Sequence, residues 1–374
     1  MHGTRVKWCG VAAAAAAIVL PTTTAGAASS GWVAGSPGVT GPVSSFSDTD
    51  AWALGSSGFA HWNGANWQQV AAPSDGSTVV RLAMSDDGPT DAWAVGAVVQ
   101  GYGRSSPRIE HWNGTGWSIS TSPAITARHA RLSGVAALSS GNAWAVGNDG
   151  HNGLVEHWNG TGWSRVEVPD PNAGGYLGST LTAVSARSAS DIWAIGTFAN
   201  NAPLPDSLYA LHFDGTAWHI VPMAQTGSQT NSNSPLANSV VAIAPNDVWV
   251  VGASGVNGPT TLTEHWNGAK WTIVPSPFDS IPNSPNSISD GALVAVTARA
   301  SNDVWAAGYY FTFTDGDPAG VYHALLVHWD GVRWTQDTAP TTGSYNTIQG
   351  ISSTLGGHRI WATNSGSPGL LTHQ

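Results

Sequence analysis

Asp91-Ala-Trp-Ala-Val-Gly96, followed by His111-Trp-Asn-Gly114 and Trp117, is one copy of a pair of phrases that recurs along the 374-residue chain. The first phrase is built around seven tryptophans, the last in a frayed copy: Trp52, Trp93, Trp144, Trp193, Trp249, Trp305 and Trp361. The second phrase returns at six histidines, each with an aromatic residue, Asn/Asp and Gly behind it: His61, His111, His157, His212, His265 and His328. The first-phrase tryptophans are 41 to 56 residues apart, a spacing that indicates a repeated four-stranded unit with loops of variable length.

Each repeat unit is predicted to contain four short strands. An apolar, β-branched stretch such as 181–185 precedes the first phrase, and Gly, Asn, Asp and Pro separate the runs. These are strand and turn signals, and no stretch has a sustained helical period. Seven such units predict an all-β, seven-bladed β-propeller.

The two ends of the repeat array complement each other. The seventh unit supplies strands near 347–352, at Trp361 and at 370–373, and then the chain stops. Gly31-Trp32-Val33 resembles the fourth strand of the other units, such as Gly116-Trp117-Ser118. We therefore expect the N-terminal strand to complete the last blade and remove its exposed sheet edge.

The N-terminal segment has the layout of a secretory signal. A basic start, an apolar run from Val11 to Leu20 and Ala25-Gly26-Ala27 predict a signal peptide over 1–28 and a propeller over 29–374, secreted to the extracellular space. Cys9 is the only cysteine, and no later segment is apolar enough for membrane insertion. The formal net charge of −10 argues against nucleic acid as a partner.

Residues that occur in every unit are interpreted as packing residues. We expect the second-strand tryptophans to fill the space between blades. The repeat histidines, with His373 as the seventh, are expected to hydrogen-bond the backbone, because histidines in different blades cannot converge on one ion. No metal, no cofactor and no catalytic residue is predicted.

The Asn/Asp-Gly-x-x-Trp turn resembles a reduced Asp-box of sialidase-type propellers. The apolar-Trp-Ala-x-Gly strand resembles a kelch-type repeat, although kelch repeats carry a Gly doublet where this chain has one Gly. Trp-rich, nearly regular propellers of this kind also resemble secreted lectins of bacterial type. The resemblance implies the propeller fold and a lectin-type binding function. It implies neither sialidase activity nor a copper site.

A binding surface is expected where the units differ, on the loops after second strands and between blades. All seven tyrosines are placed in these loops or at their edges, and exposed aromatic rings beside short polar groups suit sugars. The candidate ligand-binding residues from the aromatic loops are Tyr309, Tyr310, Phe311, Phe313, Asp315, Asp317, Tyr102 and Tyr176. Two alternatives stay open: the rings cover blade ends, or sugar pockets lie in the gaps between blades.

A second candidate group is Arg128, His129 and Arg131, in the loop that enters the third blade. Basic residues are scarce in this chain, so three together indicate either a carboxylate site, as for uronic-acid polymers, or pairing with local acids.

The function predicted from these features is carbohydrate binding, with a glycan or cell-surface polysaccharide as partner. One alternative is a target-recognition subunit of a secreted multiprotein assembly, such as an antibacterial toxin particle, with other secreted proteins as partners. The second alternative is a polysaccharide lyase or hydrolase. A hydrolase needs paired carboxylates near the channel, and the first strands, exemplified by 43–47, 181–185 and 240–244, are expected to carry none. A lyase could use His129 with Arg128 or Arg131.

Overall fold

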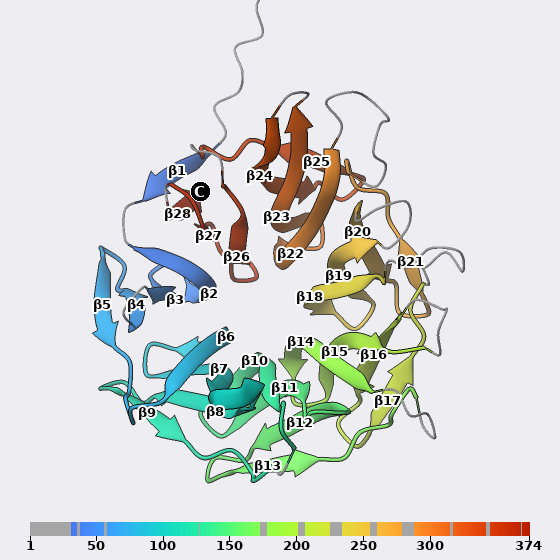
Figure 1. The fold of residues 1–374 in the computed structure, drawn as a ribbon. Coiled ribbons are helices and arrows are strands. Elements are labelled where there is room, and N and C mark those ends of the chain that lie inside the picture. The colour runs from blue at the N-terminus through green and yellow to red at the C-terminus, as the bar shows by residue number, and fades with distance from the viewer. Residues whose placement is uncertain are drawn as a thin grey trace, which may run out of the picture.

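The computed structural model is a ring of seven four-stranded antiparallel sheets around a central channel (Figure 1). It describes residues 31–374 except 36–37, 56–57, 126, 173–177, 201–205, 225–233, 255–259, 279–287, 315–316, 342–344 and 368; the side chains of 288–289, 313–314 and 317–319 are also outside the description. Within these residues no helix is both long and apolar enough to cross a bilayer. The predicted all-β, seven-bladed propeller is confirmed.

The blades follow one another in chain order, each with its first strand at the channel and its fourth at the rim. Blades 1 to 3 consist of β2 (Val39–Ser47), β3 (Asp50–Gly55), β4 (Gly58–Trp62) and β5 (Trp67–Ala71); β6 (Thr78–Gly88), β7 (Asp91–Val99), β8 (Ser105–Trp112) and β9 (Trp117–Ser120); β10 (Arg131–Ser139), β11 (Asn142–Asn148), β12 (Gly153–Trp158) and β13 (Trp163–Val166). Blades 4 and 5 consist of β14 (Ser179–Ser188), β15 (Asp191–Phe198), β16 (Ser207–Phe213) and β17 (Trp218–Val221); β18 (Leu236–Ala244), β19 (Asp247–Ser254), β20 (Thr260–Trp266) and β21 (Trp271–Ile273). Blades 6 and 7 consist of β22 (Ile288–Ala300), β23 (Asp303–Thr314), β24 (Asp317–Trp329) and β25 (Trp334–Asp337); β26 (Ile348–Ser352), β27 (Ile360–Asn364), β28 (Leu370–His373) and β1 (Trp32–Gly35). One short 3-10 helix, η1 (Gly101–Gly103), lies between β7 and β8.

The N-terminal strand closes the ring as predicted. β1 pairs antiparallel with β28, with Trp32 opposite His373, and thereby becomes the fourth strand of blade 7. Asp48 of blade 1 adds a second link, because its carboxylate accepts hydrogen bonds of 2.9–3.1 Å from the backbone N–H groups of His358 and Arg359 in blade 7.

The interfaces between blades are built by the repeated aromatic residues. Trp93 is fully buried and stacks on His111 of its own blade at 4.0 Å between ring centroids. Trp158 and Trp163 of the next blade lie 5.1 Å from the same ring. The expectation that second-strand tryptophans fill the space between blades is therefore correct.

A β-bulge in the first strand aims one side chain per blade at the channel. In blades 2 to 7 the pairing with the second strand skips one residue, and the skipped residues are Leu82, Ser133, Thr182, Asn238, Val294 and Gln349. Bulges re-aim side chains in this way. The opposing strand approaches so closely that a Cβ on Gly96 would lie 2.0 Å from the carbonyl oxygen of Val80, which explains the Gly of the first phrase.

Candidate functional site

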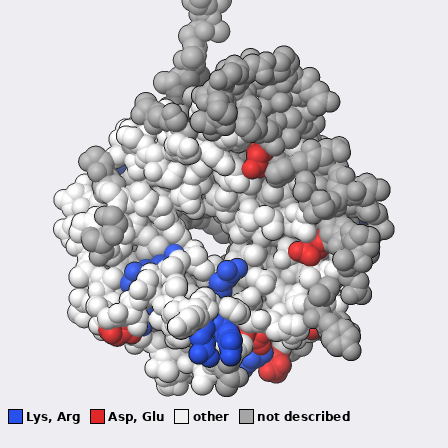
Figure 2. All heavy atoms as spheres, viewed as in Figure 1, with Lys and Arg blue, Asp and Glu red and all other residues white. Residues whose placement is uncertain are grey.

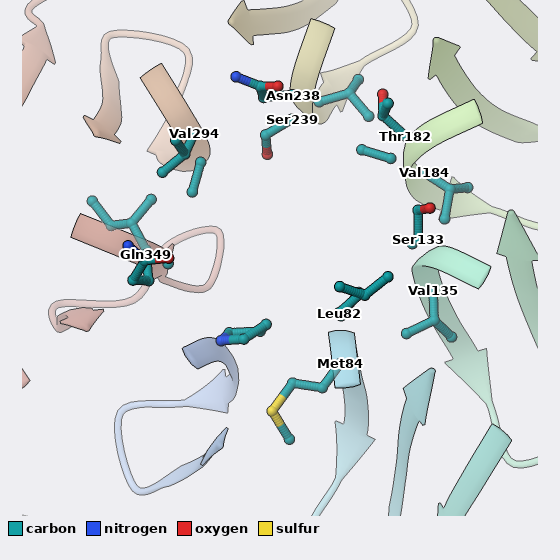
Figure 3. A pocket seen from close by; sticks show the side chains of 18 of the residues that line it. Leu82, Met84, Ser133, Val135, Thr182, Val184, Asn238, Ser239, Val294 and Gln349 are labelled. Carbon is teal, nitrogen blue, oxygen red and sulfur yellow. The ribbon is translucent and has the colours of Figure 1, made fainter. Parts of the chain in front are cut away.

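The central channel is uncharged. It encloses a cavity of about 190 Å³, lined by first-strand residues of all seven blades, among them the bulge residues (Figure 3). Two polar members are engaged with the neighbouring blade, because Thr182 Oγ1 donates to the Ala237 carbonyl at 2.5 Å and Asn238 Nδ2 donates to the Leu293 carbonyl at 2.8 Å. Nothing that lines this cavity can act as a general acid or base.

The expectation that first strands carry no carboxylate is wrong for two blades, although the three stretches named for it are uncharged. β6 contains Asp86 and Asp87, and β22 contains Asp290. Asp86 is partly buried beside the Ser44 hydroxyl and does not line the channel cavity, and its desolvation raises its pKa to about 7. The carboxylates of these strands therefore supply no acid–base pair at the channel.

Three buried glutamates lie between blades, at one position of the third strand. Glu110, Glu156 and Glu264 each precede a repeat histidine, and each is fully buried. Glu110 is neutralised by Arg81 at 2.5 Å and by Arg108 at 3.2 Å. Burial raises the pKa of Glu156 to about 7 and that of Glu264 to about 8, and each keeps one oxygen without a hydrogen-bond partner in the described chain. None of the three reaches a loop surface.

Exposed basic side chains gather in two neighbouring loops. We call this group the basic loop cluster; it is formed by Tyr102, Arg104, Arg128, His129 and Arg131. The tip between β7 and β8 meets the segment that enters blade 3: the Ser105 N–H donates to the Arg128 carbonyl at 2.8 Å, and Ser105 forms a parallel bridge with His129. The His129 Nδ1 atom lies 2.9 Å from the Gly103 carbonyl. These contacts bring the three predicted residues Arg128, His129 and Arg131 together with Arg104, and all four are exposed.

The arginines of this cluster have no acidic partner among the described residues. The ion pairs of the described chain use Arg81, Arg108, Arg165, Arg187 and Arg299, and not Arg104, Arg128 or Arg131. Arg131 opens β10, two residues before the channel-lining Ser133, so the cluster borders the channel mouth. Figure 2 shows the blue atoms on this face gathered over blades 2 and 3, beside the central opening. In an acidic protein, unpaired guanidinium groups in one place favour an anionic ligand.

Tyr102 stands at the tip of the cluster in an unusual conformation. Its φ of 62° is the only positive φ of a non-glycine residue in the described chain, and its side chain is fully exposed. A bulky residue in the left-handed region is strained, and such strain concentrates at functional sites.

The predicted aromatic loop around Tyr309, Tyr310 and Phe311 is instead a long hairpin. These residues continue β23, which pairs with β24 as far as Thr314 and Asp317. Tyr310 stacks between Phe278 and His323 at 5.1 and 4.7 Å, and Phe311 contacts Tyr322 at 4.7 Å. The rings are half-buried and pack on one another, as expected of rings that cover a blade end, and their role in ligand binding stays a prediction.

The placement of all tyrosines in loops is also wrong for Tyr209 and Tyr322. Tyr209 lies inside β16, buried between blades 3 and 4, and Tyr322 lies in β24. Tyr176 and Asp315 fall outside the described residues, as do the side chains of Phe313 and Asp317. Arg104 was missed by sequence reasoning, although a scarce basic residue in a loop after a second strand was the available signal.

The repeat histidines do not bond to the backbone as expected. They bond to the side chain that opens the second strand, as in His61–Asp50 at 2.8 Å and His265–Asp247 at 2.9 Å. His373 is not the seventh repeat histidine: Thr372 lies opposite Trp361, at the position where His61 lies opposite Trp52. Within the described residues no group of three His, Cys, Asp or Glu side chains could hold a metal ion.

Comparison with known proteins places the chain by fold alone. No protein-family model matches it, and no curated protein matches it. Among solved structures it is similar to YCF48 bound to a D1 peptide, with 16% identity, a TM-score of 0.55 and coverage of 91% of this chain and 96% of that one. It is also similar to an ulvan lyase of a polysaccharide lyase family, bound to -[GlcA(1-4)Rha3S]-, with 11% identity, a TM-score of 0.56 and coverage of 91% and 94%. The ulvan lyase without that ligand gives a TM-score of 0.57 at 11% identity, with the same coverage. These similarities support the propeller fold.

Proposed function

We propose that the protein is a secreted, lectin-like propeller that binds an acidic polysaccharide at the basic loop cluster. The observation that carries the proposal is the convergence of Arg104, Arg128 and Arg131, none with an acidic partner in the described chain, beside the exposed ring of Tyr102. Guanidinium groups form bidentate hydrogen bonds with carboxylates and sulfates, and an aromatic ring packs on the C–H face of a pyranose. Secretion is part of the proposal and rests on the signal-like residues 1–28.

The test is the affinity of the chain for polygalacturonate, with neutral dextran as the comparison polymer. Arg128→Gln with Arg131→Gln should weaken polygalacturonate binding about tenfold or more, because each guanidinium–carboxylate contact contributes roughly 1.5–3 kcal/mol. The matched control is Lys270→Gln with Arg333→Gln, which removes the same charge from exposed residues on the β20–β21 and β24–β25 turns.

The control variant should bind like the parent chain. Equal binding by both double variants, or equal binding of dextran, would overturn the proposal. Failure of every acidic polymer to bind would leave the alternative of a protein-binding ring, in which a secreted protein occupies the variable loops.

His129 supports a second candidate function, β-elimination on the same polymer. Its Nδ1–H is engaged by the Gly103 carbonyl, so the Nε2 lone pair is available to accept a proton. In this reaction His129 Nε2 removes the C5 proton α to the uronate carboxylate, a double bond forms between C4 and C5, the C4–O bond breaks, and the departing oxygen takes up a proton from solvent. A structural neighbour with the same fold is a polysaccharide lyase.

Elimination predicts ultraviolet-absorbing unsaturated products from polygalacturonate, lost on His129→Asn while polymer binding is kept. Binding without such products would leave the lectin-like function and exclude elimination of this polymer.

A further inference from the structure

Blade 7 departs from the repeat at the seam where the ring closes. In blades 1 to 6 an Asp or Asn opens the second strand and bonds to the repeat histidine, which packs on the second-strand tryptophan, as in Asp50, His61 and Trp52. In blade 7 the register puts Arg359 at the Asp position and Thr372 at the His position. The outer strand carries Gly35 where blade 1 has Val70, so that two large side chains of the repeat are missing here.

The seam between blades 7 and 1 holds a pocket, the seam pocket, of about 270 Å³, lined by Gly35, Trp62, Trp67, Arg359, Trp361, Leu370, Thr372 and Gln374. A hollow of about 310 Å³ lies at the corresponding place between blades 5 and 6, lined in part by Asp247 and His265, so the seam pocket is distinguished by a guanidinium where that hollow has a carboxylate. The Arg359 guanidinium lies over the Trp361 ring at 5.1 Å and over the Trp62 ring at 5.2 Å, in the place of the missing imidazole. Within the described chain this guanidinium has no carboxylate partner and no hydrogen bond, although its backbone N–H is held by Asp48.

We propose that the seam pocket binds one sugar residue that carries an anionic group. Arg359 supplies the charge for a carboxylate or sulfate, and its donors are free for it. Trp62 and Trp67 are partly exposed and offer indole surface for the C–H face of a sugar ring. The Gln374 amide and the Thr372 hydroxyl are the polar groups beside these rings; the hydroxyl donates to the Val33 carbonyl at 3.5 Å, and its oxygen can accept a hydrogen bond from a sugar hydroxyl.

The seam pocket lies away from the basic loop cluster. Arg359 follows the β26–β27 turn and Gln374 follows β28, whereas the cluster is built from the β7–β8 connection and the segment that enters β10. In each blade these two kinds of connection lie at opposite ends of the strands. The proposal therefore goes beyond the proposed function, because it adds a second anionic-sugar site at the other end of the blades.

The test uses D-glucuronic acid as probe and methyl glucoside as its neutral counterpart, followed by ligand-observed NMR. The starting protein is the Arg104→Gln, Arg128→Gln, Arg131→Gln chain, in which all three guanidinium groups of the loop cluster are removed. This chain should bind glucuronate saturably and methyl glucoside far more weakly. Arg359→Gln should reduce glucuronate affinity about tenfold, which is the usual effect of losing one charge-assisted hydrogen bond.

A second variant distinguishes the loss of the binding site from a loss of the fold. Arg359→Asp with Thr372→His rebuilds the pair found in the other blades, so its thermal melting by circular dichroism should match or exceed that of the parent, and it should lose glucuronate binding. Unchanged affinity in either variant, or no binding to the starting protein, would overturn the proposal. If glucuronate binds through Arg359 while no acidic polymer binds the loop cluster, the seam pocket stands and the proposed function falls.

Discussion

Tyr102 holds a backbone conformation that is unfavourable for a residue with a bulky side chain, and it does so with its ring in solvent. Asn tolerates the left-handed region better, so Tyr102→Asn should raise the free energy of unfolding by about 0.5–1 kcal/mol. The same change removes the exposed ring, and we expect weaker polygalacturonate binding. Denaturant titration and a binding isotherm measure the two effects. If the variant is more stable but binds polygalacturonate as well as the parent, the strained conformation of Tyr102 does not serve ligand binding.

Glu264 makes stability depend on pH. Its pKa is raised from 4.5 to about 8 by burial. Below pH 4.5 the Glu264 carboxyl is protonated in both the folded and the unfolded protein. Between pH 4.5 and about 8 it is ionised only in the unfolded protein. The free energy of unfolding therefore falls as the pH rises through this window.

Glu264→Gln should remove this dependence and raise stability at about pH 9 by on the order of 5 kcal/mol, with little effect at about pH 4. Urea denaturation at both pH values measures it. Glu110→Gln is the matched control, because Glu110 occupies the same repeat position but is paired with Arg81 and Arg108. That change should destabilise by about 3 kcal/mol. Similar shifts in both variants would contradict the distinction between the two carboxyl groups.

At the scale of the element, the β8–β9 turn contains two glycines with different roles. Gly114 has a φ of 88°, and a Cβ there would lie 3.1 Å from the Thr90 side chain, whereas a Cβ on Gly116 would meet nothing within 4 Å. Gly114→Ala should cost about 1 kcal/mol or more, and Gly116→Ala should be neutral or slightly stabilising. Thermal denaturation of the two variants compares them directly. Equal effects would show that the turn relaxes without the left-handed conformation.

Much of each blade was predictable because its turns and tryptophans recur in every copy. The bulge was not, because the residue it aims at the channel differs from blade to blade: Leu82, Ser133 and Asn238 share no side-chain type. Four of the five residues of the basic loop cluster were named from the sequence, Tyr102 as a loop aromatic and Arg128, His129 and Arg131 as near neighbours in a chain with few basic residues. Arg104 joins them through pairing between Ser105 and His129, 24 positions apart, which no local pattern reports. The long hairpin of blade 6 was missed because its aromatic run resembles a loop insertion.

On the scale of the whole molecule, Trp32 carries the closure of the ring. It is buried at 5% exposure and packs edge-to-face on Trp305 at 5.6 Å. Trp32→Ala should destabilise the protein by about 3–5 kcal/mol through the cavity alone, with a further loss because the closing strand is released. Hydrogen exchange should show lost protection in β26, β27 and β28.

Trp271→Ala is the control, since Trp271 occupies the corresponding place in blade 5 and contacts Trp193 at 5.5 Å. That blade is continuous in the chain, so its exchange should change only locally. Equal losses in the two variants would show that β1 contributes only its packing.

The bulge that turns one side chain per blade into the channel also makes this protein a candidate scaffold for design. Leu82, Ser133, Val294 and Gln349 line the cavity, and in the described chain the Gln349 amide donates only to the nearby Thr347 hydroxyl, so these four side chains can be replaced without breaking a side-chain hydrogen bond to another blade. The exceptions are Thr182 and Asn238, whose polar atoms bind adjacent blades. Identical substituents at these four positions would come from four of the seven blades and would line part of the channel with a polarity chosen independently of the fold. A single gene would thus encode a channel lining that can be edited one blade at a time.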